Sequence, residues 1–159
     1  MNDKANILIV DDEEVVRVSH LRSLQGMNFN TRVAEDGTRA LQVMEEQAFD
    51  VILLDLRMPD LDGMEVLRTV KQRWPDSEVV VITGYPTIES AKEAVRLGAH
   101  NYLAKPLCPD DVVKAANDAM TQKRWALHSD LSGQEAENLV KHRPLSATAA
   151  PLIEEGERS

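Results

Sequence analysis

Five residues in this sequence carry the side chains needed to hold a divalent cation and to transfer a phosphoryl group. Asp11 and Asp12 begin a run of four acids, and Asp55, Thr83 and Lys105 each lie at the end of a separate apolar run. Carboxylate oxygens are the ligands that Mg²⁺ prefers. A carboxylate beside such a cation can attack phosphorus and become an aspartyl phosphate, while the metal and a lysine stabilise the transferring oxygens.

Each of these residues also has a simpler interpretation. Asp55 could cap the next helix, although Asp62 is better placed to do so. The acidic run could be a solvated segment, Lys105 a structural ion-pair partner of Asp11, and Thr83 an ordinary strand residue. The shared position at strand ends favours a site, because ligands bind at the carboxyl ends of parallel strands.

The elements that must position these residues alternate along the chain. Buried strands are expected at residues 6–10, 31–34, 51–54, 78–83 and 101–104, because these runs are apolar without polar alternation. Helical patterns follow each strand, at about 14–25, 37–44, 63–74 and 87–97, and from Asp110, which we expect to cap the last helix. Gly26 and Gly98 are expected stops. Five strand-helix repeats predict an α/β protein with a doubly wound parallel sheet and helices on both faces.

Composition limits the class of protein. The 159 residues are 43% hydrophobic and 28% charged, which fits one globular domain with a modest extension. No apolar stretch could span a membrane and no secretory signal is visible, so we expect a cytoplasmic protein. A net charge of −9 argues against direct binding to nucleic acid, and the single cysteine, Cys108, excludes an internal disulfide.

Four short motifs together resemble the receiver (CheY-like) domain of a two-component response regulator, over about residues 5–123. They are the acidic pair Asp11-Asp12, DLRMPDLDG around Asp55, ITG with Thr83, and Lys105-Pro106. The resemblance implies a flavodoxin-like (βα)5 fold with strand order 2-1-3-4-5. Such a domain is a signalling module, not an enzyme in the usual sense, since it catalyses only its own aspartyl phosphorylation and dephosphorylation.

The resemblance also assigns roles to the acidic residues and the lysine. Asp55 would be the phosphoacceptor, Asp12 a direct Mg²⁺ ligand and Asp11 a ligand through water. Arg57 would contribute its backbone carbonyl to the metal. Lys105 would pair with the phosphate, and its bond to the following proline would be cis.

A second group of residues would form the family's switch. Thr83 would hydrogen-bond a phosphate oxygen, and Tyr102 would swing inward, unless it is only an amphipathic strand residue. Partners should then bind the face formed by elements 87–97, 101–104 and the helix from Asp110. Arg57 and Tyr85, two residues after Asp55 and Thr83, are large and do not orient an attacking water, so we expect slow self-dephosphorylation.

The chain is expected to divide into a receiver domain at residues 1–124, a helical extension at 125–143 and a flexible acidic tail at 144–159. Trp125, Leu127 and Leu131 continue the last helical pattern, and Ser132 begins a capping-box sequence. The tail has two prolines and terminal acids, which favour mobility. Packing of its apolar residues onto the domain is the alternative.

The expected partners are a sensor histidine kinase or a histidine phosphotransfer protein, and an unknown downstream protein. A homodimer through the last two helices stays open. We read a stand-alone receiver or phosphorelay intermediate; the alternatives are a fragment of a longer transcriptional regulator and an unphosphorylated docking module. A phosphatase with an aspartate nucleophile is disfavoured, because Arg57 stands where such enzymes usually carry a second acid.

Overall fold

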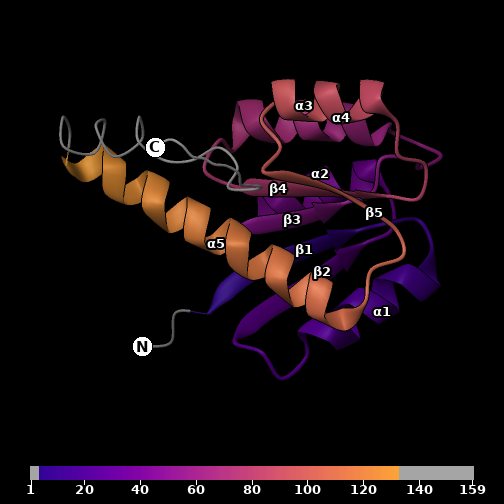
Figure 1. Ribbon diagram of the computed structural model, residues 1–159, viewed down its shortest axis with the longest axis horizontal. Coiled ribbons are helices and arrows are strands. Elements are labelled where there is room, and N and C mark those ends of the chain that lie inside the picture. Colours follow the sequence, from indigo (N-terminus) through magenta and orange to yellow (C-terminus); the bar gives the residue numbers. More distant parts are fainter. Residues whose placement is uncertain (1–3, 133–159) are drawn as a thin grey trace, which may run out of the picture. The chain divides into compact units, whose positions relative to one another are not determined.

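The computed structural model describes residues 4–132, with side chains described as far as residue 125. A single five-stranded sheet forms the centre, and its strands are all parallel in the order β2-β1-β3-β4-β5 (Figure 1). The strands are β1 Ala5–Val10, β2 Phe29–Ala34, β3 Val51–Leu54, β4 Glu78–Thr83 and β5 Asn101–Ala104. The helices are α1 Glu14–Leu24, α2 Gly37–Glu46, α3 Gly63–Arg73, α4 Ile88–Arg96 and α5 Pro109–Ser132. The predicted flavodoxin-like architecture and strand order are confirmed.

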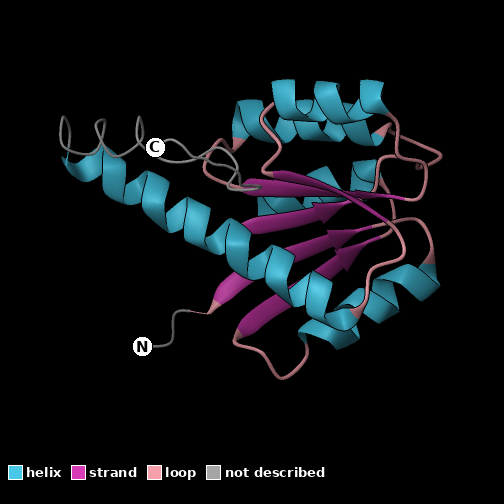
Figure 2. Ribbon diagram, viewed as in Figure 1, coloured by secondary structure: helices cyan, strands magenta, loops and turns pink. Residues whose placement is uncertain are grey.

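Helices cover both faces of the sheet, and this explains why its central strands are apolar throughout. Figure 2 shows α1 and α5 on one face and α2, α3 and α4 on the other. Successive residues of β1 enter different cores: Ile7 and Ile9 pack with α5, whereas Leu8 and Val10 pack with α2 and α3. A strand buried on both sides cannot alternate apolar and polar residues.

Local sequence signals set most of the helix ends. The Asp62 side chain accepts the Met64 N–H at the start of α3, so Asp62, and not Asp55, is the cap. Thr87 caps α4 as predicted, accepting the Ser90 N–H at 3.0 Å. Gly26 follows α1 with a φ of 83°, a conformation that glycine adopts without strain.

Two predicted boundaries are wrong. β2 begins at Phe29, two residues before the expected start. Asp110 does not cap α5, because the helix already begins at Pro109, whose fixed φ suits a first helical position. The carboxylate of Asp111 instead accepts the backbone N–H of Cys108, at 3.3 Å.

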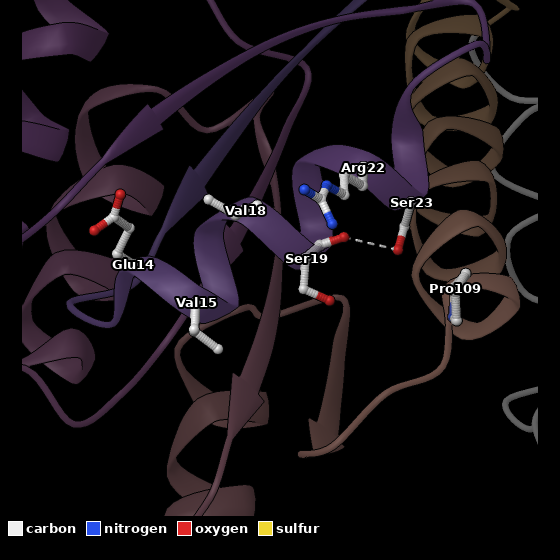
Figure 3. Close-up of a pocket in the computed structure, with 7 residues that line it drawn as sticks. All are labelled: Glu14, Val15, Val18, Ser19, Arg22, Ser23 and Pro109. Atoms are coloured by element: carbon white, nitrogen blue, oxygen red, sulfur yellow. Dashed lines mark hydrogen bonds between the residues drawn. The ribbon is translucent and has the colours of Figure 1, made fainter.

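α1 forms where its apolar pattern predicts, but it leaves most of that pattern in solvent. His20 and Leu24 are its buried residues, whereas Val15 is 79% exposed and Val18 is 38% exposed. Figure 3 shows the hollow beside this helix, where Val15 and Ser19 extend from α1 and Pro109 comes from the start of α5. The exposed side of α1 therefore carries two exposed valines beside polar residues such as Glu14 and Arg22, which line the same hollow.

The chain divides into two units after Lys123. α5 continues beyond that point to Ser132, and the remainder of the expected helical extension, to residue 143, lies outside the described residues. The expected acidic tail at 144–159 and the side chains of Leu127 and Leu131 lie outside them as well. Among the described helices, none has the length and apolar character needed to cross a bilayer.

Candidate functional site

The backbone of the sheet brings the predicted site residues to one edge. The ladder extends just past the strand ends: the Asp55 N–H donates to the Val10 carbonyl at 2.9 Å, and the Lys105 N–H donates to the Thr83 carbonyl at 2.8 Å. The bond to Val10, together with the place of β3 between β1 and β4, puts Asp55 between the ends of those two strands. Because β1 has β2 on one side and β3 on the other, this edge is the topological switch point of the sheet.

Three carboxylates converge there. Asp11, Asp12 and Asp55 each offer one oxygen, and these oxygens lie within 4.8 Å of one another. Asp11 and Asp55 are 2% and 4% exposed, whereas Asp12 is open to solvent. Buried carboxylates at this spacing repel one another, and a hard divalent cation that takes oxygen ligands fits both their charge and their chemistry.

Lys105 supplies positive charge to the cluster. Its Nζ lies 2.8 Å from Asp11 Oδ2, 3.6 Å from Asp55 Oδ1 and 3.8 Å from Glu13 Oε1. Burial alone would lower the pKa of Lys105, but the hydrogen bond and attraction of Asp11 outweigh burial and raise that pKa. The Lys105-Pro106 bond is cis, as the resemblance implies.

Asp55 is the residue whose protonation is most altered. Its burial, followed by repulsion from Asp11, raises the pKa of the Asp55 carboxyl from 3.8 to about 6, although Lys105 opposes this rise. A carboxylate that is costly to ionise gains more than a solvated one from a neighbouring cation. Binding of a cation next to Asp55 is therefore electrostatically favourable.

Thr83 and Tyr102, the two residues predicted to form a switch, each make polar contacts. Thr83 is fully buried, and its Oγ1 accepts the Tyr85 N–H at 3.1 Å. The Tyr102 hydroxyl accepts the Thr87 N–H at 3.2 Å and is hydrogen-bonded to Ser90. Tyr102 thus links β5 to the first turn of α4, a contact that its place in an amphipathic strand does not explain.

The two large residues that flank the site touch each other. The Arg57 guanidinium carbon lies 4.0 Å from the centre of the Tyr85 ring, within the range of a cation–π contact. Sequence reasoning identified both residues but missed their contact. The signal was available, since Arg57 and Tyr85 follow the ends of two adjacent strands, three residues after Leu54 and two residues after Thr83.

Sequence reasoning missed two further residues near the site. A side chain at Gly63 would overlap the Asp55 carbonyl and the Leu56 backbone. Glycine therefore allows α3 to begin in contact with the loop that carries Asp55. His20 is buried on α1, and this burial lowers the pKa of its imidazole. The charge of Asp11 opposes the decrease, and the charge of Lys105 adds to it. The DG pair at Asp62-Gly63 signalled the first; nothing in an apolar stripe signalled the second.

Comparison with known proteins agrees with this geometry. Residues 7–117 match the family described as "Response regulator receiver domain". A putative response regulator NtrX-like protein of Rickettsia felis is 37% identical over 110 residues, covering 68% of this chain and 23% of that protein. The transcriptional regulatory protein ZraR of Escherichia coli is 37% identical over 123 residues, covering 75% and 27%.

A solved structure gives the same result in three dimensions. The receiver domain of NtrX from Brucella abortus superposes with a TM-score of 0.68 at 33% identity, covering 72% of this chain and 98% of that domain. The chain spans about a quarter of the length of the curated relatives above, and the matching part is their receiver. The chain therefore belongs to the response regulator receiver domain family.

Proposed function

We propose that Asp55 accepts a phosphoryl group from a phosphohistidine of a sensor kinase or a histidine phosphotransfer protein. An oxygen of Asp55 attacks phosphorus while the bond between phosphorus and the imidazole nitrogen breaks. The bonding electron pair stays on that nitrogen, and the donor leaves as neutral imidazole because its other ring nitrogen keeps its proton. The observation that carries the proposal is the cluster of three carboxylates with Lys105 Nζ 3.6 Å from Asp55.

The residues present fit a Mg²⁺ ion. Asp12 and Asp55 would bind it directly, Asp11 through water and Arg57 through its backbone carbonyl. When bound, Mg²⁺ would neutralise the charge of the carboxylates and of the incoming phosphoryl oxygens. The chain's own contribution is to hold Asp55 by its backbone bond to Val10, and to hold Lys105 beside it.

We further propose that the signal passes through Thr83 and Tyr102. A phosphoryl group adds about −1.5 to −2 charges and would attract the Thr83 hydroxyl, which now accepts the Tyr85 N–H. Movement of Thr83 makes room for Tyr102, whose hydroxyl would leave Thr87 and Ser90. The α4, β5 and α5 face would then present a different surface to a downstream protein or to a second copy of the chain.

The exposed side of α1 supports docking of a histidine-bearing partner. Val15 lies three residues after Asp12 in the sequence and is 79% exposed, and it lines a hollow that Pro109 also borders (Figure 3). Apolar contacts beside a reactive carboxylate can hold a donor protein in place. Val15→Lys should slow transfer from a phosphorylated histidine phosphotransfer domain, yet leave phosphorylation by acetyl phosphate unchanged. Val95→Lys on α4, which replaces another exposed valine, is the control.

The central experiment measures intact mass after incubation with Mg²⁺ and acetyl phosphate. We expect a gain of one phosphoryl group that is absent from Asp55→Asn and from a sample with chelator. The gained group should persist for much longer than seconds, since Arg57 and Tyr85 do not position an attacking water. An unmodified protein that also fails to bind Mg²⁺ in a titration would instead support an unphosphorylated docking module.

The downstream output of this receiver depends on whether it acts alone or as part of a longer regulator. Its curated relatives are longer regulators, so a role within a transcriptional regulator is the alternative to a stand-alone receiver or phosphorelay intermediate. With a net charge of −9, the chain is proposed to act in the cytoplasm through protein partners, without direct contact with nucleic acid.

A further inference from the structure

The contact between Arg57 and Tyr85 joins the two loops that border the site. Arg57 lies in the loop after β3, two residues from Asp55, and Tyr85 lies in the loop after β4, two residues from Thr83. The guanidinium carbon is 4.0 Å from the ring centre, and Tyr85 as a residue is 63% exposed. The stack therefore connects the loop of the phosphoacceptor to the loop that carries the switch hydroxyl.

The Arg57 guanidinium has no carboxylate partner in the described part of the chain. Five other arginines, on β2, α2, α3 and α4, form ion pairs with glutamates: Arg32, Arg39, Arg68, Arg73 and Arg96. Among the side chains described, Arg57 makes no such pair, and its partner is the Tyr85 ring. Arg57 also lines an open hollow together with Asp12, which places it at the metal side of the site.

The other cation of the site is already engaged. Lys105 Nζ is closer to Asp11, at 2.8 Å, than to Asp55, at 3.6 Å. A phosphoryl group on Asp55 would therefore meet one shared lysine and, two residues away, one guanidinium held only by a ring. An exposed cation–π contact gives about a two- to fivefold preference, whereas a guanidinium bonded to phosphate oxygens makes shorter, charge-assisted and often bidentate bonds.

From these contacts we infer that the Arg57 guanidinium stacks on the Tyr85 ring while Asp55 is unmodified. When Asp55 is phosphorylated, the guanidinium leaves the ring and binds the phosphoryl oxygens. This inference rests on the proposed phosphorylation of Asp55. Arg57 then serves as a second cationic ligand of the phosphoryl oxygens, in addition to offering its backbone carbonyl to the metal.

The same movement would release the loop after β4. Tyr85 is held by its ring, through Arg57, and by its N–H, which donates to Thr83 Oγ1 at 3.1 Å. A rotation of the Thr83 side chain toward a phosphoryl oxygen would lengthen that hydrogen bond. Departure of Arg57 removes the other hold on Tyr85, so the two changes favour each other and couple the phosphoryl group to α4.

The test compares initial rates of phosphorylation by subsaturating acetyl phosphate with Mg²⁺. Tyr85→Ala frees the guanidinium and should raise the rate about two- to fivefold. In an Arg57→Gln background the same alanine substitution should have no effect, because no guanidinium remains to be freed. Arg73→Gln is the matched control. Arg73 stacks on Trp74 at 4.4 Å, at the far end of α3, and its loss should leave the initial rate of phosphorylation unchanged.

A structural readout accompanies the rates. In the unmodified protein the side-chain Nε–H proton of Arg57 should show a ring-current shift, which Tyr85→Phe keeps and Tyr85→Ala removes. Adding beryllofluoride with Mg²⁺, as a phosphoryl mimic, should abolish the shift in the wild type but not in Asp55→Asn.

The outcomes separate this inference from the proposed function. If the wild type gains no phosphoryl group and also fails to bind Mg²⁺, the proposed function fails independently of the stack. If Asp55 is phosphorylated but Tyr85→Ala accelerates the reaction equally without Arg57, the ring acts by its bulk alone and the inference is overturned. A ring-current shift that persists with beryllofluoride bound overturns it as well.

Discussion

The Nζ atom of Lys105 lies 2.8 Å from Oδ2 of Asp11, so this lysine is bonded to a carboxylate other than the proposed phosphoacceptor. Its distance to Asp55 Oδ1, 3.6 Å, is that of a weaker second contact. One partly buried lysine thus balances two buried carboxylates. Pairing with Asp11 in the unmodified protein is compatible with pairing with a phosphoryl group on Asp55. The Lys105 ammonium can pair with Asp11 before phosphorylation and move toward the phosphoryl group on Asp55 afterwards.

Replacing Lys105 with methionine should destabilise the protein as well as block phosphorylation. Loss of one partner from a buried ion pair leaves uncompensated charge and costs about 3–5 kcal/mol. Urea unfolding in chelator at pH 7.5 would measure the change. Lys114→Met, which breaks an exposed pair with Asp118, should cost less than about 1 kcal/mol. Equal losses for the two variants would contradict the buried-pair interpretation.

Stability without metal should fall as the Asp55 carboxyl ionises. The folded pKa of about 6 is above the ordinary value of 3.8, so the folded state binds the proton more tightly, and its advantage is lost as pH rises from about 4 to beyond 6. Asp55→Asn should therefore be more stable than the wild type at pH 7.5 in chelator, by roughly 1–3 kcal/mol.

The same comparison in saturating Mg²⁺ completes this prediction. Because a bound cation favours the ionised carboxylate, Mg²⁺ should stabilise the wild type more than Asp55→Asn and narrow the gap between them. Unfolding curves collected at pH 5 and pH 7.5 would show both effects. A wild type that gains stability between these two pH values in chelator, relative to Asp55→Asn, would be the opposite of the expected sign.

Gly63 should tolerate no side chain. Its Cβ would overlap the Asp55 carbonyl and the Leu56 backbone, and relief requires movement of the loop that carries Asp55. Gly63→Ala should cost about 1–3 kcal/mol and slow phosphorylation by acetyl phosphate. Gly26→Ala, at a φ of 83° with nothing within 4 Å of the new carbon, should cost about 1–2 kcal/mol and leave that rate unchanged.

The contact between Tyr102 and Ser90 should hold α4 in its unphosphorylated position. Tyr102→Phe and Ser90→Ala each remove the hydrogen bond between β5 and the first turn of α4, at a cost of about 0.5–1.5 kcal/mol. The double variant should cost less than the sum of the two, because both changes remove the same bond. Ser23→Ala with Tyr102→Phe should be additive, since Ser23 bonds only within α1.

The local sequence determined the order of elements and the membership of the site. Apolar runs fixed the strands, and Asp62 and Thr87 fixed the starts of α3 and α4. Since parallel strands must end at a common edge, the polar residues that follow them had to meet there. The sequence alone therefore predicts that Asp11, Asp55 and Lys105 lie together.

Tertiary structure decided which side chains pair within that edge and which sides of the helices are buried. The exposure of Val15 depends on how α1 lies on the sheet, and the apolar pattern alone does not set that rotation. The start of α5 at Pro109 depends on the turn after β5. The preference of Lys105 for Asp11 and the stack of Arg57 on Tyr85 depend on distances between loops that are far apart in sequence. Periodicity and capping act over a few residues, whereas these contacts arise only when the whole sheet is assembled.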